Sequence, residues 1–329
     1  MHRHPSRRAL LQAAGLLSAL ATLPMAALAQ AAYPERPITL VVPNAAGGAA
    51  DNLARSIAEE LAQRLKQPVL VENLGGASGA LGAQKVLRAA PDGYTLLFGT
   101  TSDMVVTPIA NRGAGYAVKD FTPIAKVGVT PMTLVARPGL GVQTVDQLVA
   151  LARSKPNGLS IGTTGNASLQ AFAAVALQRA AGIDLLGVPY KGGAPLLNDL
   201  LGGQIDLGVL TLPGALAQAR AGKLVMLGLL WPQRAGSAPD MPTVNESVSV
   251  KGVSVEIWAA LAGPPGLPAP VVDRLSRAVQ EVLADKAFSE RRAKLGDMAV
   301  PFAPPAEFAR FLQAEDERYR ALASGLKLE

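Results

Sequence analysis

Short apolar runs alternate along the chain with segments whose apolar residues recur at helical spacing. The strand-like runs are Ile38–Val42, Val69–Glu72, Thr95–Phe98, Met132–Ala136, Leu159–Ile161, Leu185–Val188, Leu207–Leu210 and Leu224–Leu229. The helical patterns among them are Ala50–Lys66, Ala80–Ala90, Val145–Arg153, Ser168–Ala181, Ala194–Leu201 and Gly214–Ala221. This alternation, with short connections rich in Gly, Pro and Asn, predicts an α/β fold of mostly parallel sheets flanked by helices.

Two long extended stretches, Phe121–Pro138 and Val253–Pro265, interrupt the alternation and indicate crossings between two lobes. The tail then turns helical over Pro270–Ala284 and Pro305–Leu322, with prolines near both starts, as is typical of helix N-termini. We therefore predict that residues 30–130 and 258–329 form lobe one and residues 131–257 form lobe two, with a ligand cleft between them. A hinge of two crossings favours ligand capture by closure.

Residues 1–29 have the pattern of a cleavable secretion signal. Arg3, Arg7 and Arg8 precede the apolar run Ala9–Ala29, and Ala27-Leu28-Ala29 fits a small-residue cleavage site. The segment that begins at Ser6-Arg7-Arg8 also resembles a twin-arginine export signal. Either route predicts export from the cytoplasm.

Composition removes several classes of function. The formal charge is +6, and loss of the three signal arginines lowers it to about +3. There is no Lys/Arg run and no interleaving of aromatic and basic residues, so nucleic acid is not an expected partner. The chain has no cysteine, and both histidines, His2 and His4, lie in the predicted signal. Serine-histidine and cysteine-histidine nucleophiles and typical zinc sites are thereby excluded from the mature chain. We predict no catalytic residue, metal or cofactor, so a non-catalytic binding protein is the default interpretation.

The segment from Pro43 to Asp51 joins a buried strand to a helix through a glycine pair. The first amides of a helix have no internal partner and favour an anion, and glycine lets the backbone approach a ligand. The candidate ligand-binding residues here are Asn44, Gly47, Gly48 and Asp51. The alternative is that the glycines serve only the turn and that Asp51 only caps the helix.

Polar side chains follow other predicted strands. The further candidate ligand-binding residues are Thr100, Thr101, Ser102 and Asp103 after one strand, Thr163, Thr164, Gly165, Asn166 and Ser168 before a helix of lobe two, and Tyr190 and Lys191 after a third strand. The hydroxyls and amides of the second group predict another anion cradle. In the alternative interpretation Lys191 is a solvated surface charge.

The order of motifs resembles a known family. The motifs are Tyr33-Pro34-Glu35-Arg36-Pro37 with Gly47-Gly48 and Asp51; Val71-Glu72-Asn73 with Ala90-Pro91-Asp92-Gly93-Tyr94; Val188-Pro189-Tyr190-Lys191-Gly192 with Gly202-Gly203-Gln204-Ile205-Asp206; and Pro239-Asp240-Met241-Pro242-Thr243. In this order the chain resembles the Bug-type periplasmic solute-binding receptors of tripartite tricarboxylate transporters.

The resemblance implies a two-lobed, periplasmic-binding-protein-like fold with a small carboxylic acid in the cleft. It implies that main-chain amides and ordered waters hold the carboxylate, and that the site loops are Asn44–Asp51, Gly99–Asp103, Thr163–Gln170 and Pro189–Gly192. It further implies a monomeric periplasmic receptor that delivers a small organic acid to membrane permease subunits.

Departures from the family pattern concern the ligand's charge. Family members often place Asp-Asn after the strand at Leu207, where this chain has Leu210-Thr211. We therefore expect a monocarboxylate, or an amino or hydroxy acid, to be preferred over a tricarboxylate such as citrate. Two other functions stay open: a ligand-sensing adaptor for a membrane sensor kinase, and a secreted α/β enzyme. The enzyme would bind a phosphorylated cofactor at the glycine-rich segment Gly76–Gly82, which is not the dinucleotide fingerprint.

Overall fold

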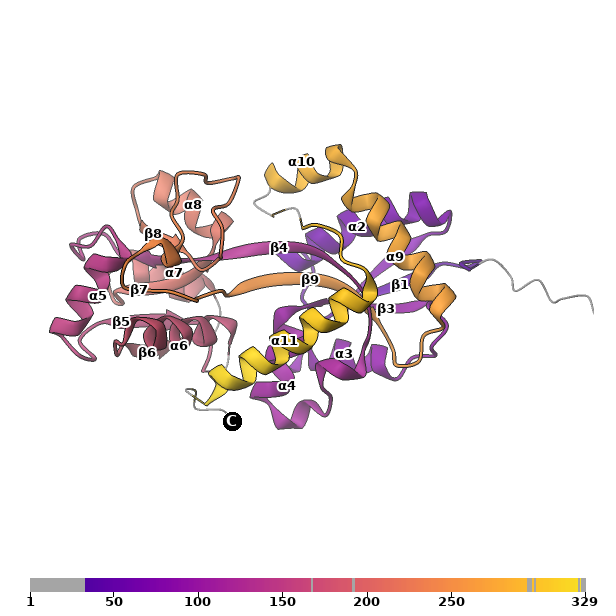
Figure 1. Cartoon of the computed structure of the whole chain (residues 1–329), viewed down its shortest axis with the longest axis horizontal. Helices are drawn as coiled ribbons and strands as arrows, with labels where there is room; N and C mark the ends of the chain where they lie inside the picture. The colour runs from indigo at the N-terminus through magenta and orange to yellow at the C-terminus, as the bar shows by residue number, and fades with distance from the viewer. Residues whose placement is uncertain are drawn as a thin grey trace, which may run out of the picture.

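Two lobes joined by a pair of long strands make up the computed structural model, which describes residues 33–166, 168–190, 193–294, 298, 300–324 and 326. The predicted signal, residues 1–29, lies outside the described residues. The joining strands are β4 (Thr122–Ala136) and β9 (Glu256–Gly263), which run side by side from one lobe toward the other (Figure 1). They lie within the two extended stretches predicted to be crossings.

Lobe one contains a mixed sheet in the order β2-β1-β3-β9-β4. Its strands β1 (Ile38–Val42), β2 (Val69–Asn73) and β3 (Thr95–Thr100) are parallel, whereas β9 is antiparallel to β3 and β4. The helices of this part of the chain are α2 (Ala49–Leu65), α3 (Ala80–Leu87), α4 (Thr107–Ala110), α9 (Ala269–Leu283), α10 (Lys286–Lys294) and the short turns η1 (Ala77–Gly79), η2 (Ser102–Val106), η3 (Arg112–Ala114) and η4 (Val118–Asp120). Leu40, Ile57 and Leu275 belong to the core between the sheet and helices α2 and α9.

Lobe two has its own sheet, to which β4 also contributes. Strands β5 (Ser160–Thr163), β6 (Leu186–Pro189) and β7 (Leu207–Thr211) are parallel, and β4 lies antiparallel between β7 and β8 (Val225–Leu229). The surrounding helices are α5 (Val145–Ser154), α6 (Leu169–Ala181), α7 (Gly193–Leu201), α8 (Leu212–Arg220) and η5 (Val244–Glu246).

Strand β4 divides its pairing between the two sheets. Its residues from Thr122 to Pro131 pair with β9, and those from Met132 to Ala136 pair with β7 and β8. The α/β class and two-lobed fold are as predicted, with antiparallel strands at the junction. The exact lobe limits, at residues 130/131 and 257/258, stay a prediction.

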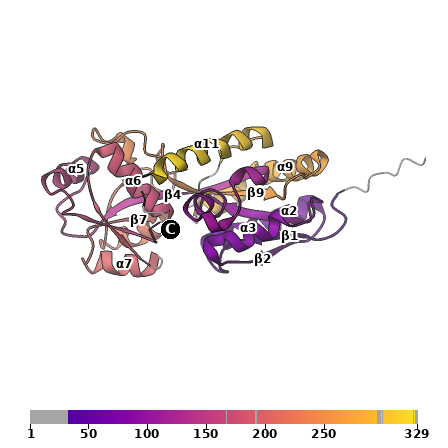
Figure 2. The ribbon, with the colours of Figure 1, turned by 90° about the horizontal axis from the view of Figure 1, so that it is seen from below.

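Helix α11 (Pro305–Ala323) lies along one side of both lobes (Figure 2). Its residue Glu315 accepts a hydrogen bond from Nε1 of the buried Trp258 at 2.9 Å, next to the joining strands. Further along, the ring of Tyr319 meets that of Phe172 of α6 edge-on, with centroids 5.4 Å apart. Helix α11 therefore packs against the side of the junction between the lobes and stabilises it.

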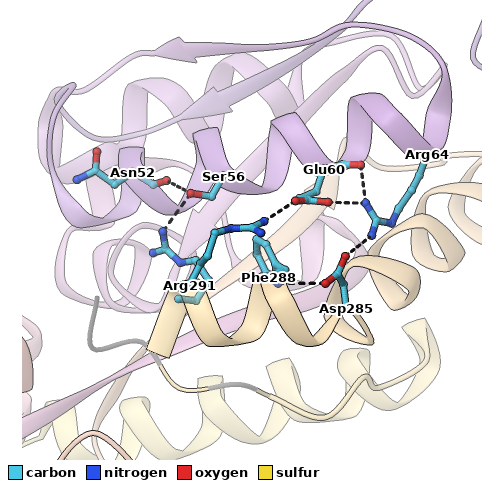
Figure 3. Close-up of polar contacts among 8 residues, drawn as sticks. Asn52, Ser56, Glu60, Arg64, Asp285, Phe288 and Arg291 are labelled. Carbon is cyan, nitrogen blue, oxygen red and sulfur yellow. Dashed lines mark hydrogen bonds and ion pairs between the residues drawn. The ribbon is translucent and has the colours of Figure 1, made fainter. Parts of the chain in front are cut away.

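Helix α10 was not predicted from the sequence, because Phe288 is the only large apolar residue in its nine-residue span. Polar contacts attach it to α2 (Figure 3). Arg291 pairs with Glu60 at 2.6 Å, and Asp285, just before α10, pairs with Arg64 at 3.4 Å. The side chain of Asp285 also accepts from the backbone N–H of Phe288 at 3.1 Å, which satisfies a free amide in the first turn of the helix.

Candidate ligand-binding site

A cavity of about 400 Å³ lies where loops of the two lobes meet. Its walls come from the ends of β1, β2 and β3 in lobe one and from the segment between β5 and α6 in lobe two. The lining residues are Pro43, Asn44, Ala45, Gly75, Gly76, Ser78, Gly79, Ser102, Val106, Thr107, Thr164, Ser168, Leu169 and Gln170. This is the carboxyl edge of parallel strands, where open α/β sheets bind ligands.

The predicted turn between β1 and α2 is held by Asp51, whose side chain is buried. Its carboxylate accepts hydrogen bonds from the backbone N–H of Gly47 at 2.8 Å, from Nε of Arg55 at 3.1 Å and from Nδ2 of Asn73 at 3.0 Å. The N–H of Gly47, before the other donors, holds the pKa of Asp51 below its ordinary value. This geometry favours the local interpretation, in which Asp51 fixes the turn, and the structure does not place it in the cavity wall.

The two glycines of this turn differ in what the backbone requires of them. Gly47 has φ +82°, a conformation that side-chain-bearing residues rarely adopt, so the turn itself needs glycine there. Gly48 has φ −77° and ψ 172°, which any residue adopts, and an added Cβ would meet only the carbonyl oxygen of Ala45 at 3.6 Å. Both glycines are exposed beside the cavity rather than in its wall, which Asn44 and Ala45 form.

After β3, only Ser102 among the predicted residues lines the cavity. Thr100, Thr101 and Asp103 are buried and bonded within the protein. The hydroxyl of Thr101 donates to the carbonyl of Glu256 at 3.1 Å and accepts from the N–H of Trp258 at 2.9 Å, so it ties β3 to β9. These residues support the site from behind.

In lobe two, Thr164 and Ser168 line the cavity, whereas Thr163, Gly165 and Asn166 do not. The hydroxyl of Thr164 donates to Oε1 of Gln170 at 2.7 Å, which holds both side chains at the wall. Ser168 caps α6 by accepting from the N–H of Ala171 at 3.2 Å.

In the third predicted group, Tyr190 does not line either cavity. The hydroxyl of Tyr190 donates to Oδ2 of Asp199 in α7 at 2.8 Å, and burial raises the pKa of this tyrosine. Lys191 lies outside the described residues.

The loop Gly75–Gly79 lines the cavity and was missed as a ligand-binding element. Four successive residues, Gly76 to Gly79, have positive φ, including Ala77 at 46° and Ser78 at 57°. Gly79 packs so closely that an added Cβ would lie 2.7 Å from Cβ of Asp103. The sequence signal for this loop is the density of small residues after Asn73, which also underlies the alternative of a phosphorylated cofactor.

A second cavity of about 240 Å³ adjoins the first in lobe two and shares Thr164 and Gln170 with it. Its other lining residues are Gly193, Ala194, Leu197, Val209, Leu210, Thr211 and Gly214, at the starts of α7 and α8 and the end of β7. Leu210 and Thr211 are the pair that departs from the family pattern, and the structure places them at the site.

Among the residues that the structure describes, neither cavity is lined by a titratable side chain. The buried Asp103 lies behind Gly79 of the lining, and burial raises its pKa to about 6 against the opposing hydrogen bonds from Thr100. Among the described residues no cluster of His, Cys, Asp and Glu could hold a metal ion, and no helix is long and apolar enough to cross a membrane. The site therefore offers neutral donors, from amides, hydroxyls and the Gln170 carboxamide.

Comparison with known proteins decides the family. Residues 53–328 match the model of the tripartite tricarboxylate transporter family receptor. The chain belongs to this receptor family.

Among relatives of this receptor, a UPF0065 protein of Agrobacterium vitis is 36% identical over 304 residues, covering 92% of this chain and 88% of that protein. The solved structure of the periplasmic binding protein BugD is 36% identical, with a TM-score of 0.73 over 89% of this chain and 98% of BugD. The R. palustris protein Rpa4515 with adipate is 30% identical, with a TM-score of 0.77 over 89% of this chain and 99% of that one. The predicted Bug-type resemblance is confirmed, and the BugD structure is described as that of a periplasmic binding protein.

Proposed function

We propose that this receptor binds a small organic carboxylate in the cavity between its lobes and performs no chemistry on it. The observation that carries the proposal is the lining: a cavity of about 400 Å³ whose described residues offer neutral donors and include no titratable side chain. Backbone amides near helix starts and hydroxyl groups stabilise an anion without a counter-charge. General acid–base catalysis, in contrast, needs a titratable side chain within reach of the reacting atoms.

No described residue of either lining carries a cationic side chain, and this restricts the charge of the ligand. Burying a second carboxylate without a matching cation costs several kcal/mol unless it is fully hydrogen-bonded. Two carboxylates fit only when each lobe takes one, as the separate donors at Ser102 and at the Gln170 carboxamide would allow. We therefore propose a preference for a monocarboxylate, or an amino or hydroxy acid, over a tricarboxylate.

A thermal-shift screen across carboxylic acids, followed by calorimetry, tests this proposal, because a ligand that binds only the folded state raises the unfolding temperature. The competition series is citrate, a dicarboxylate and a monocarboxylate of similar size. The monocarboxylate or hydroxy acid is expected to bind more tightly than citrate and to be recovered unchanged. Tightest binding by citrate would contradict the charge argument, and turnover of the bound acid would contradict the non-catalytic role.

The family supports a transport role in which a monomeric receptor hands its ligand to membrane permease subunits from the periplasm. The signal predicted in residues 1–29 would supply the export step. Mass spectrometry of the protein from a periplasmic extract tests export: a mature N-terminus just after Ala29 is expected. A full-length chain in the cytoplasmic fraction would contradict it.

A further inference from the structure

A groove distinct from the two cavities described above also lies between the lobes. It shares no lining residue with either cavity. Its volume is about 490 Å³. The lining residues are Pro213, Leu216, Ala217 and Arg220 of α8, Gly236 and Ser237 after β8, and Ala293 and Lys294 of α10. Helices α8 and α10 lie on the same side of the joining strands in Figure 1. The groove thus takes one wall from each lobe.

The charge of the groove is one-sided. Arg220 and Lys294 are exposed on its opposite walls, and the described residues of the lining include no acid. Within the described part of the chain, neither side chain forms a salt bridge. The Oγ of Ser237, between the walls, is shielded from solvent and has no hydrogen-bond partner among the described residues. The groove therefore combines two uncompensated cations with an unused polar group.

The lobe-one wall is fixed to the helix that begins at the ligand-binding turn. Glu60 of α2 pairs with Arg291 of α10 at 2.6 Å and with Arg64 of its own helix at 2.7 Å. Phe288 of α10 is buried in the lobe-one core, where its side chain lies toward α2 beside Arg291 (Figure 3). These contacts make α10 move with α2, whose N-terminus follows Gly47 and Gly48.

The lobe-two wall moves with the other half of the ligand site. Helix α8 packs against β4, β7 and β8, and its first turn, at Gly214, lines the smaller cavity. The distance between the Arg220 and Lys294 walls is consequently set by the angle between the lobes, which ligand capture by closure changes.

We propose that this groove is the docking surface for an acidic polypeptide segment of the receptor's membrane partner. Opposite charges on the two surfaces steer the encounter and fix its register. A segment that contacts both Arg220 and Lys294 distinguishes the open from the closed receptor, because only one lobe angle matches its length. The inference rests on the proposed transport function, since it assigns the surface by which the receptor meets its partner.

The first test uses a fluorescein-labelled peptide of alternating Glu and Ser as the probe, in fluorescence anisotropy at about 0.15 M salt, where the screening length is about 8 Å. The double variant R220E/K294E is compared with R112E/K155E, which reverses two exposed cations, one from each lobe, away from the groove. R220E/K294E is expected to bind the peptide about tenfold more weakly than the wild type, because attraction becomes repulsion at both walls. The matched variant is expected to change affinity less than twofold. Equal losses in the two variants would show that only net charge matters and would overturn the proposal.

The second test locates the contact. Carbodiimide couples a carboxylate to a lysine amine, and peptide mapping then identifies the lysine. Lys294 is expected to be the dominant site; coupling at Lys155 that is as frequent would overturn the proposal.

If R220E/K294E fails to fold, R220Q/K294Q takes its place with a smaller expected loss. Both tests run without a carboxylate ligand, so their failure counts against the groove alone, and failure of the carboxylate screen counts against the proposed function alone.

Discussion

The carboxylate of Asp103 accepts hydrogen bonds from Thr100 twice, from its backbone N–H at 2.9 Å and from its hydroxyl at 2.6 Å. Both residues are buried, and the backbone carbonyl of Asp103 accepts a further hydrogen bond from the hydroxyl of Tyr116. The sequence predicts Asp103 as a candidate ligand-binding residue. In the structure the carboxylate of Asp103 is instead hydrogen-bonded within lobe one, where it holds the end of β3 against Gly79.

This burial predicts a measurable dependence of stability on pH. The pKa of Asp103 is raised from 3.8 to about 6 in the folded protein, so the folded state binds a proton that the unfolded state releases between these values. Its contribution to stability is fully present below pH 3.8 and is lost as pH rises through about 6. The loss amounts to roughly 3 kcal/mol.

Urea unfolding of the wild type and of Asp103→Asn, measured from pH 4 to pH 7, checks this prediction. The amide retains an acceptor for Thr100 but does not titrate, so subtracting its curve isolates the carboxylate. We expect the wild type to lose stability relative to the variant as pH rises. A difference that stays constant over this range would show that the carboxyl group has an ordinary pKa.

Gly47 and Gly48 are expected to separate turn formation from ligand binding. Gly47→Ala should lower the free energy of unfolding by about 1–2 kcal/mol, because alanine at positive φ is strained.

Gly48→Val is compatible with the observed backbone and should cost at most about 1 kcal/mol as a poorer N-cap. If the Gly48 backbone approaches the ligand, that same variant loses carboxylate affinity at least tenfold in calorimetry. Unchanged affinity would assign Gly48 to the turn alone.

Asn73 is expected to position the ligand-binding turn without touching the ligand. Its Nδ2 donates to the carbonyl of Asn44 at 3.2 Å and to Asp51 at 3.0 Å. Asn73→Ala should therefore weaken carboxylate binding while costing about 1–2 kcal/mol of stability.

The matched control is Asn245→Ala. Asn245 likewise makes two hydrogen bonds that hold a loop, to the carbonyl and N–H of Val253, far from the cavity. It should lose comparable stability with no change in ligand affinity. Equal effects of both variants on affinity would mean that general loosening, rather than the turn, is being measured.

The fold could be predicted because its signals are local. Each buried strand is a short apolar run, and the crossings that contain β4 and β9 are unusually long extended segments. Asn44, Ser102, Thr164 and Ser168 were likewise predictable at the site, because each follows a strand whose carboxyl end meets the other lobe. Helix α10 was missed because its attachment is polar, through Arg291 and Glu60, and leaves no apolar periodicity.

The remaining site residues depend on tertiary contacts that a single chain position does not reveal. Packing decides whether a hydroxyl faces a cavity or a neighbouring strand. Thr101, for example, forms hydrogen bonds with β9, whereas Ser102 lines the cavity. The loop at Ser78 has positive φ values that only its surroundings impose. The glycine-rich composition indicates that the backbone comes close to another group there, but it does not identify that group.

The ion pair between Lys126 of β4 and Glu256 of β9 is expected to stabilise the junction of the lobes. Their side chains are 15% and 5% exposed, and Nζ lies 2.8 Å from Oε1 and 4.3 Å from the centroid of the Phe311 ring. Removing one partner of a buried pair leaves an uncompensated charge and typically costs about 3–5 kcal/mol. Lys126→Met should therefore destabilise the protein by about that amount at neutral pH, and the double variant Lys126→Met/Glu256→Gln should recover part of the loss.

The pH dependence of Lys126→Met distinguishes an electrostatic loss from a packing loss. Burial already raises the pKa of Glu256, and Lys126 opposes that rise, so losing the lysine raises the pKa further. A raised carboxyl pKa gives stability that is present at low pH and lost as pH rises through the folded value. Urea unfolding should show Lys126→Met recovering stability on acidification from pH 7 to pH 5 more steeply than the wild type, and the double variant should not show this. Parallel curves for all three proteins would mean that Lys126 contributes through the packing of its aliphatic stem against Phe311 rather than through its charge.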